Sequence, residues 1–233
     1  MKVRVRYVVL AAVLLTMAAC ASVKHREVPP APAAHPPAAQ VEGTHYRVVP
    51  EQSEVHILVY RGGPLARLGH NHVMVSRDVA GDIWIADSIE RSSLMVNMPV
   101  ETLIVDDAEA RRSEGADFPV EVPEDAKQGT RKNMLSAAVL DGDQFKTIEL
   151  RSTAISGTRT ALRLTLAITI KDQTREVEVP ASVSYEQDRW VATGEFAIKQ
   201  SDFGIQPFSV AMGAVQVVDE LRIKFKVSGV REE

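Results

Sequence analysis

The C-terminal part of the chain alternates between apolar and polar residues. Four runs show this pattern, over residues 162–170, 177–185, 190–198 and 221–227. Successive side chains on a strand point to opposite faces, so the runs predict strands with one apolar and one solvated face. Long antiparallel strands of this kind close readily into a barrel whose interior collects the apolar side chains. Such a barrel is a container, which indicates a small hydrophobic ligand.

Shorter segments of the same kind precede the long runs. We expect strands over residues 45–49, 54–60, 73–76, 81–86, 92–100 and 147–155. The alternation stops between residues 106 and 142. Asp106 is placed to cap a short helix that ends near Arg112, and a proline followed by two acids begins a second helix over residues 123–140. The sequence therefore predicts an all-β barrel with a helical insertion, a lid or plug, in its middle.

The first residues of the chain have the features of an export signal. Basic residues precede an apolar stretch over residues 7–17, which is shorter than the roughly 20 residues of a transmembrane helix. The sequence Met17-Ala18-Ala19-Cys20 resembles the bacterial lipobox, in which a peptidase cuts before a cysteine that then carries lipid. Cys20 is the only cysteine in the chain. We expect residues 1–19 to be a signal peptide and Cys20 to be lipidated, the alternative being a secreted protein with an incidental cysteine.

Residues 20–43 have the composition of a spacer. Prolines and alanines dominate this segment, which favours an extended polyproline conformation and supplies no core. Residues 44–233 are long enough for one domain with a good core. Ala21, and not aspartate, follows the cysteine, which by resemblance to the sorting rule of enteric bacteria favours the outer membrane. We therefore expect a lipoprotein on the periplasmic face of a bacterial envelope, held to the membrane by an acyl anchor on Cys20.

The charge and the motifs of the chain exclude several functions. The formal net charge of −4 becomes −7 when the three basic residues before Cys20 are removed, which argues against a nucleic-acid partner. Glycine-rich phosphate loops and the motifs of common hydrolases are absent from the sequence. We expect Asp202 to serve a turn in which Gly204 adopts a positive φ. The carboxylates of the insertion indicate a solvated face and not general acid–base catalysis: Glu109, Glu114, Glu121, Glu124 and Asp125.

Several short segments resemble the YceI-like family of exported barrels. They are Tyr46-Arg47-Val48-Val49-Pro50, the passage over residues 135–153, the strand and hairpin over residues 164–177, and Ser201-Asp202-Phe203-Gly204-Ile205. The resemblance implies a lipocalin-like antiparallel barrel that binds an amphiphilic isoprenoid, such as a polyprenyl or quinone lipid, for storage, transport or stress protection. It implies no cofactor and no catalytic residue. The chain departs from the family pattern at the Gly69-His70-Asn71-His72 loop and in its longer, more charged segment over residues 109–129.

The apolar side of the strands predicts the residues that line the lumen. The aromatic content of 5% leaves few large rings to fill a barrel, which favours a cavity over a solid core. The alternative is an interior filled by its own side chains. The predicted lining residues are Leu164, Leu166, Ile168, Val179, Val183, Phe196, Ile198, Phe203, Ile223 and Phe225.

The Gly69–His72 loop is the main candidate for polar chemistry. His70 and His72 are two residues apart, which on an extended chain places both imidazoles on one side, where they could share a metal ion with His56. A second interpretation is that His70, Asn71 and His72 contact a polar head group at the barrel mouth. In a third, the same side chains only hydrogen-bond a tight loop. The remaining alternative for the whole protein is an interaction module of the cell envelope that binds no ligand.

Overall fold

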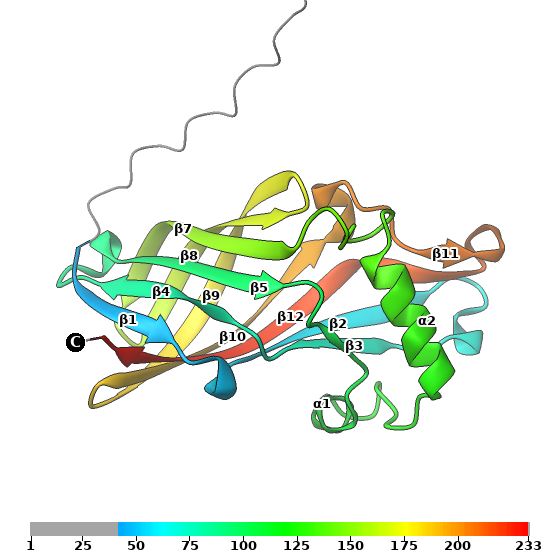
Figure 1. Ribbon diagram of the computed structural model, residues 1–233, viewed down its shortest axis with the longest axis horizontal. Coiled ribbons are helices and arrows are strands. Elements are labelled where there is room, and N and C mark those ends of the chain that lie inside the picture. Colours follow the sequence, from blue (N-terminus) through cyan, green and yellow to red (C-terminus); the bar gives the residue numbers. More distant parts are fainter. Residues whose placement is uncertain (1–41, 233) are drawn as a thin grey trace, which may run out of the picture. The chain divides into compact units, whose positions relative to one another are not determined.

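The computed structural model describes residues 42–232 (Figure 1). The expected signal peptide, the lipidated Cys20 and most of the proline-rich spacer lie outside the described residues. Gln40–Glu233 forms one compact unit with its own closed sheet and core, so we expect this unit to fold without the preceding segment. None of the helices between residues 42 and 232 has the length and apolar character needed to cross a membrane.

Within the described residues, twelve strands form one antiparallel sheet. The strands are β1 (Thr44–Val48), β2 (Glu54–Gly62), β3 (His72–Ser76), β4 (Ala80–Ile85), β5 (Ser93–Pro99), β6 (Ile104–Val105), β7 (Thr147–Thr158), β8 (Ala161–Ile170), β9 (Gln173–Glu186), β10 (Arg189–Lys199), β11 (Ser209–Val210) and β12 (Val215–Arg231). Two α-helices, α1 (Ala108–Ser113) and α2 (Glu124–Leu135), lie between β6 and β7. The expected order of strands, a helical insertion and further strands is therefore confirmed.

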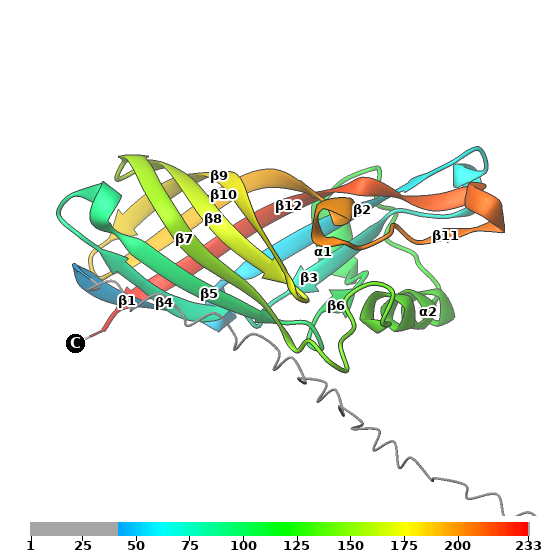
Figure 2. The same ribbon diagram turned by 90° about the horizontal axis from the view of Figure 1, so that it is seen from above.

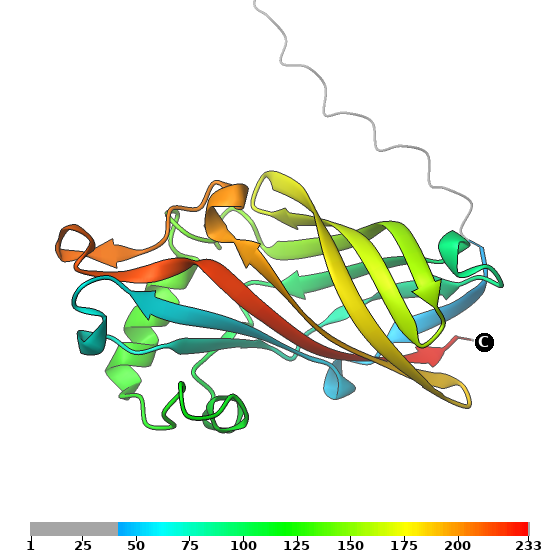
Figure 3. The same cartoon turned by 180° about the vertical axis from the view of Figure 1, so that it is seen from behind.

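Strand β12 closes the barrel and also extends the sheet. The order β1-β4-β5-β7-β8-β9-β10-β12 returns to β1 through the β1–β12 pairing, which makes a closed barrel of eight strands. One edge of β12 pairs with β10. On the opposite edge, the C-terminal part of β12 pairs with β1, and Val48 faces Gly229. Earlier in β12 the same edge pairs with β2, and Glu54 faces Lys226. Figure 3 shows β12 running between β10 and β2. Strands β2, β3 and β12 reach past the ends of β7–β9 (Figure 2).

The long strands follow the alternation of the sequence. On β8, Leu164, Leu166, Ile168 and Ile170 are buried, and the residues between them are more exposed. The expected second helix is too long, because α2 ends at Leu135 and not at residue 140. Ser136 has an extended backbone, and its hydroxyl donates to the carbonyl of Asn133 at 2.7 Å, so the last turn ends there. The sequence does not predict the two-residue strands β6 and β11.

The residue that caps α1 is Asp107, and the expectation for Asp106 is wrong. The Asp107 carboxylate accepts from the backbone N–H groups of Glu109 and Ala110 at 3.1 and 3.0 Å. Asp106 instead has a φ of 54°, a left-handed conformation that aspartate tolerates better than most residues. This conformation turns its side chain into the protein, where Asp106 is fully buried.

A second, smaller core lies on the outer face of β2 and β3. Side chains of β2 alternate, so that Val55, Ile57 and Val59 face the barrel interior while Leu58 and Tyr60 face outward. Leu58 packs in a buried cluster with Phe118 and its neighbours Val73, Val75 and Ala110. The segment over residues 106–120, which includes α1, therefore covers the outside of this part of the sheet.

Candidate ligand cavity and histidine cluster

The barrel encloses a cavity of about 340 Å³. This volume lies within the range of roughly 300–1,000 Å³ that is typical of sites for small ligands. Each of the ten lumen residues expected from the sequence lines it: Leu164, Leu166, Ile168, Val179, Val183, Phe196, Ile198, Phe203, Ile223 and Phe225. The side chains of the barrel therefore leave space inside it, although the ligand-binding role of these residues stays a prediction.

The cavity extends between the two ends of the barrel. Tyr185 and Trp190 line it beside the turn between β9 and β10. Thr130 and Met134 of α2 line it at the other end, together with Phe203, which follows β10. The helical insertion therefore contributes part of the wall, as expected for a lid or plug. Figure 1 shows where α2 lies relative to the strands.

Polar groups are few along the cavity wall. Among the described residues that line it, His72 and Tyr185 are the only ones with a titratable side chain. The amide of Gln200 already donates to the carbonyl of Val218 at 3.0 Å, and the hydroxyl of Ser92 accepts from the backbone N–H of Ala86 at 3.0 Å. Burial of a charge without a partner is costly, so the wall favours a neutral, mainly apolar ligand.

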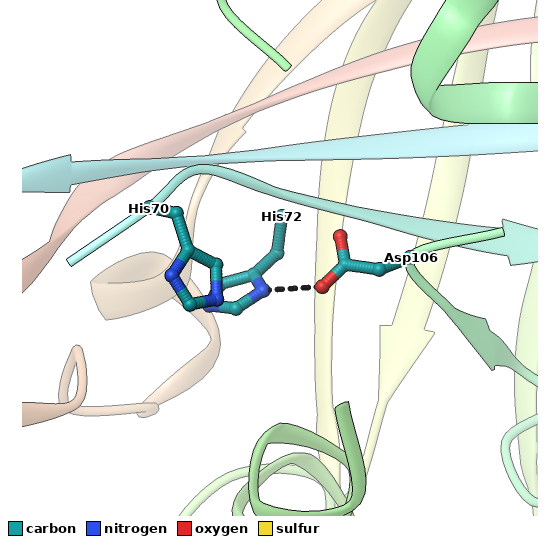
Figure 4. Close-up of side chains that lie close together, drawn as sticks. All are labelled: His70, His72 and Asp106. Atoms are coloured by element: carbon teal, nitrogen blue, oxygen red, sulfur yellow. Dashed lines mark hydrogen bonds and ion pairs between the residues drawn. The ribbon is translucent and has the colours of Figure 1, made fainter. Parts of the chain in front are cut away.

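A polar cluster adjoins the cavity where β3 begins (Figure 4). His72 pairs across the sheet with Val59, which places its ring on the lumen side of β3. Its Nδ1 lies 2.7 Å from Oδ2 of Asp106. The other oxygen, Oδ1, accepts from the backbone N–H of Val73 at 3.0 Å and from the guanidinium of Arg111. The carboxylate therefore holds the His72 ring in a fixed orientation.

Asp106 and Arg111 are a buried ion pair with no exposed side-chain surface. Burial alone would raise the pKa of Asp106, but the hydrogen bonds from His72 and Val73 and the charge of Arg111 outweigh it and lower this pKa. The guanidinium of Arg111 also donates to the carbonyl of Asn71 at 2.8 Å. Arg111 therefore ties the histidine loop to the helical insertion, a role that the sequence alone does not indicate.

His70 lies next to His72. Its Nε2 atom is buried and has no hydrogen-bond partner among the described residues. The two imidazole rings meet edge to face with their centroids 4.6 Å apart. Burial lowers the pKa of His70, and the neighbouring His72 lowers it further. Both effects favour the neutral form of the His70 ring, which carries a nitrogen lone pair.

Asn71, between the two histidines, holds the loop. Its Oδ1 accepts from the backbone N–H of Arg61 at 3.0 Å, and its Nδ2 donates to the carbonyl of Asp117 at 2.9 Å. Both bonds fit the interpretation of a hydrogen-bonded loop. The side chain of Asn71 is thereby engaged away from a ligand head group.

His56 does not join the other two histidines. It lies on the outer face of β2, where its Nδ1 is 2.7 Å from Oε1 of Glu114 and its Nε2 contacts Glu54. The second oxygen of Glu114 accepts from Lys224 at 2.5 Å, and only 5% of its side chain is exposed. The expected grouping of His56 with His70 and His72 is therefore wrong, as is the solvated position expected for Glu114. Asp106 stands where His56 was expected.

The closed eight-stranded barrel with an apolar cavity has a lipocalin-like architecture. The model of the YceI-like domain matches residues 46–229, and the chain belongs to this family. A YceI-like barrel is a fold that binds hydrophobic ligands.

Solved structures are similar to this chain at low sequence identity. The crystal structure of BcnA from Burkholderia cenocepacia is 15% identical, with a TM-score of 0.56 over 78% of this chain and 98% of that chain. The YCEI protein of Campylobacter jejuni is 13% identical, with a TM-score of 0.48 over 69% of this chain and 84% of that chain. No curated protein matches the chain. At these identities the likeness to the solved structures concerns the fold alone.

Proposed function

We propose that this protein binds a long-chain amphiphile of the isoprenoid type, such as a polyprenyl or quinone lipid, inside its barrel. The observation that carries the proposal is the cavity, which extends between the barrel ends and has a mostly apolar wall. An extended chain with few polar atoms fits this shape and chemistry. Storage, transport or stress protection are the roles that such a container serves.

The energetics favour a long chain over a short one. Each buried methylene contributes roughly 0.8 kcal/mol, so ten carbons would contribute about 8 kcal/mol. Association costs roughly 4–15 kcal/mol, which would cancel between half and all of this gain. A chain of about 20 carbons would contribute about 16 kcal/mol and leave a net gain. We therefore expect a ligand with several isoprene units, with its polar end near one barrel mouth.

The cellular setting is part of the proposal. We infer a lipoprotein of the bacterial envelope, anchored through Cys20 and facing the periplasm, because the basic, apolar and small residues before Cys20 have the order of a lipoprotein signal. A barrel held beside a membrane by a spacer would exchange a poorly soluble lipid with that membrane over a short distance. Mass spectrometry of the full chain from bacterial membranes tests the anchor, since a Cys20→Ala variant should lack the acyl mass.

The decisive experiment on the ligand is mass spectrometry of an organic extract from residues 40–233, purified without detergent. A polyprenyl or quinone species recovered in a constant ratio to protein is expected. A fatty acid or phospholipid in the same ratio would support lipid binding inside the barrel but contradict the isoprenoid class of ligand. Protein free of any lipid, and unable to take up added polyprenol or quinone, would contradict the proposal. The cavity favours a barrel that binds a lipid over an interaction module, because a barrel filled by its own side chains would suffice for the latter.

A further inference from the structure

We propose that His70, His72 and Asp106 form a binding site for a divalent transition-metal ion of the zinc type at the edge of the cavity. One potential ligand atom from each of these residues lies within 4.8 Å of the other two. Two imidazoles and a carboxylate are a donor set that Zn²⁺ and its neighbours in the first transition series bind well, and that Mg²⁺ and Ca²⁺ do not prefer.

The separation of the three side chains suits a small coordination sphere. Ligands at roughly 2.0–2.1 Å from a tetrahedral zinc ion lie about 3.3 Å from one another. His72 Nδ1 and Asp106 Oδ2 are 2.7 Å apart, so a metal ion would replace their hydrogen bond and move the two atoms apart by about half an ångström. Because the ligand atoms lie within 4.8 Å of one another, His70 would have to approach by at most about 1.5 Å. His70 Nε2 has no hydrogen bond to break in doing so.

The surroundings hold the carboxylate in place for such a role. Asp106 Oδ1 is occupied by the backbone N–H of Val73 and by Arg111, which leaves Oδ2 for the metal ion. Groups that bind the far side of a ligand in this way commonly orient metal sites and increase the affinity. The charge of Arg111 opposes the approach of a cation, so we expect weaker binding than at zinc sites built from thiolates.

A hydrogen-bonded loop alone does not account for His70. Side-chain bonds from Asn71 and Arg111 already hold this loop, while the Nε2 of His70 is buried without a partner among the described residues. A buried polar atom without a partner costs roughly 1–3 kcal/mol. A metal ion bound to this nitrogen removes that cost and explains why the ring faces His72 (Figure 4).

The site would keep a coordination position open. Three protein ligands leave at least one position of a tetrahedral ion for water or another oxygen. Because His72 lines the cavity, that position lies beside the space in which the barrel ligand is proposed to bind. The metal site itself does not depend on the proposed lipid, and the two are tested separately.

The test is a titration of residues 40–233 with Zn²⁺ alone, followed by calorimetry and by competition with a chromogenic chelator. This unit excludes Cys20 and the two histidines of the spacer, which would otherwise bind metal on their own. We expect one ion per chain, and Co²⁺ in its place should give the visible absorption of a four- or five-coordinate ion. Loss of a group that only orients a ligand costs 10–100-fold, so His70→Ala and His72→Ala should each weaken binding by at least about 100-fold.

Matched histidine variants provide the controls. His45→Ala removes a ring that stacks on Trp84 and contacts Asp82, and His56→Ala removes the ring between Glu54 and Glu114. Both should bind Zn²⁺ as the unchanged protein does. His70→Ala is the decisive variant, because His70 Nε2 has no hydrogen bond whose loss would unfold the barrel. Binding that survives in this variant, or no binding of Zn²⁺, Co²⁺, Ni²⁺ or Cu²⁺ at millimolar concentration, would overturn the proposal.

Discussion

A phenyl ring placed inside the barrel should compete with the proposed ligand. Ala192 lies on β10 between Val183 of β9 and Val227 of β12, and it lines the cavity. Ala192→Phe adds about six carbons to the wall, which would displace about six carbons of the ligand. At roughly 0.8 kcal/mol per buried carbon the gross loss is about 5 kcal/mol. A flexible chain can shift along the cavity and recover about half of that, so we expect a net loss of about 2.5 kcal/mol, or roughly 70-fold in affinity.

The same strand supplies a matched control. Ala197 lies on the exposed side of β10, where it pairs with Arg222. Ala197→Phe adds the same ring to the same strand outside the lumen and should leave binding unchanged.

The assay is displacement of a fluorescent long-chain probe by a polyprenol, with urea unfolding of each variant to show that the barrel is intact. A ring that enters empty space displaces no packed atoms, so Ala192→Phe should unfold within about 1 kcal/mol of the unchanged protein. If Ala192→Phe folds and still binds as tightly as Ala197→Phe, the ligand does not occupy this part of the cavity and the reasoning is refuted.

Two further predictions concern the polar contacts around the insertion. Arg111→Met should lower the free energy of unfolding by about 3–5 kcal/mol in urea titrations, because it leaves the buried carboxylate of Asp106 without its cation; a loss below about 1 kcal/mol would mean that the pair contributes little. For Glu114, burial would raise the pKa, but the hydrogen bonds from Lys224 and His56 and their charges lower it below its ordinary value of 4.5. A carboxyl group with a lowered pKa in the folded state stabilises the fold above pH 4.5, and this stability is lost as the pH falls through the folded-state pKa. Glu114→Gln should therefore be less stable than the unchanged protein at pH 7 and lose less stability below pH 4.5, and equal acid sensitivity of the two proteins would contradict this.

The barrel and its lining could be predicted because they depend on local alternation. A strand buries every second residue when one face meets an apolar interior, so the pattern in the long strands identifies both the strand and its inner face. The branching of the sheet at β12 could not be predicted from local alternation. It depends on β12 pairing with both β1 and β2, and on two-residue strands that contain too few residues to show a period.

The alternation along β2 also determines the face on which His56 lies. His56 stands between Val55 and Ile57, whose side chains face the lumen, so the alternation along β2 already places it on the outer face. His72 pairs with Val59 on the inner face. A metal site that combines His56 and His72 would need ligands from both faces of one sheet. The alternation of side chains along the strand is enough to argue against such a site.

Asp106 shows where the sequence has no such signal. Asp106 and Asp107 are adjacent carboxylates before a helix, and either could cap it; a positive φ at the first residue decides that Asp107 caps and Asp106 turns inward. Its partner His72 is 34 residues away, and the contact of Glu114 with Lys224 spans 110 residues. The apolar lumen is thus set by local pattern, whereas its polar edge is set by the segment over residues 106–120 folding back on β2 and β3. We therefore expect substitutions in that segment to change what binds at the barrel edge while the lumen keeps its shape.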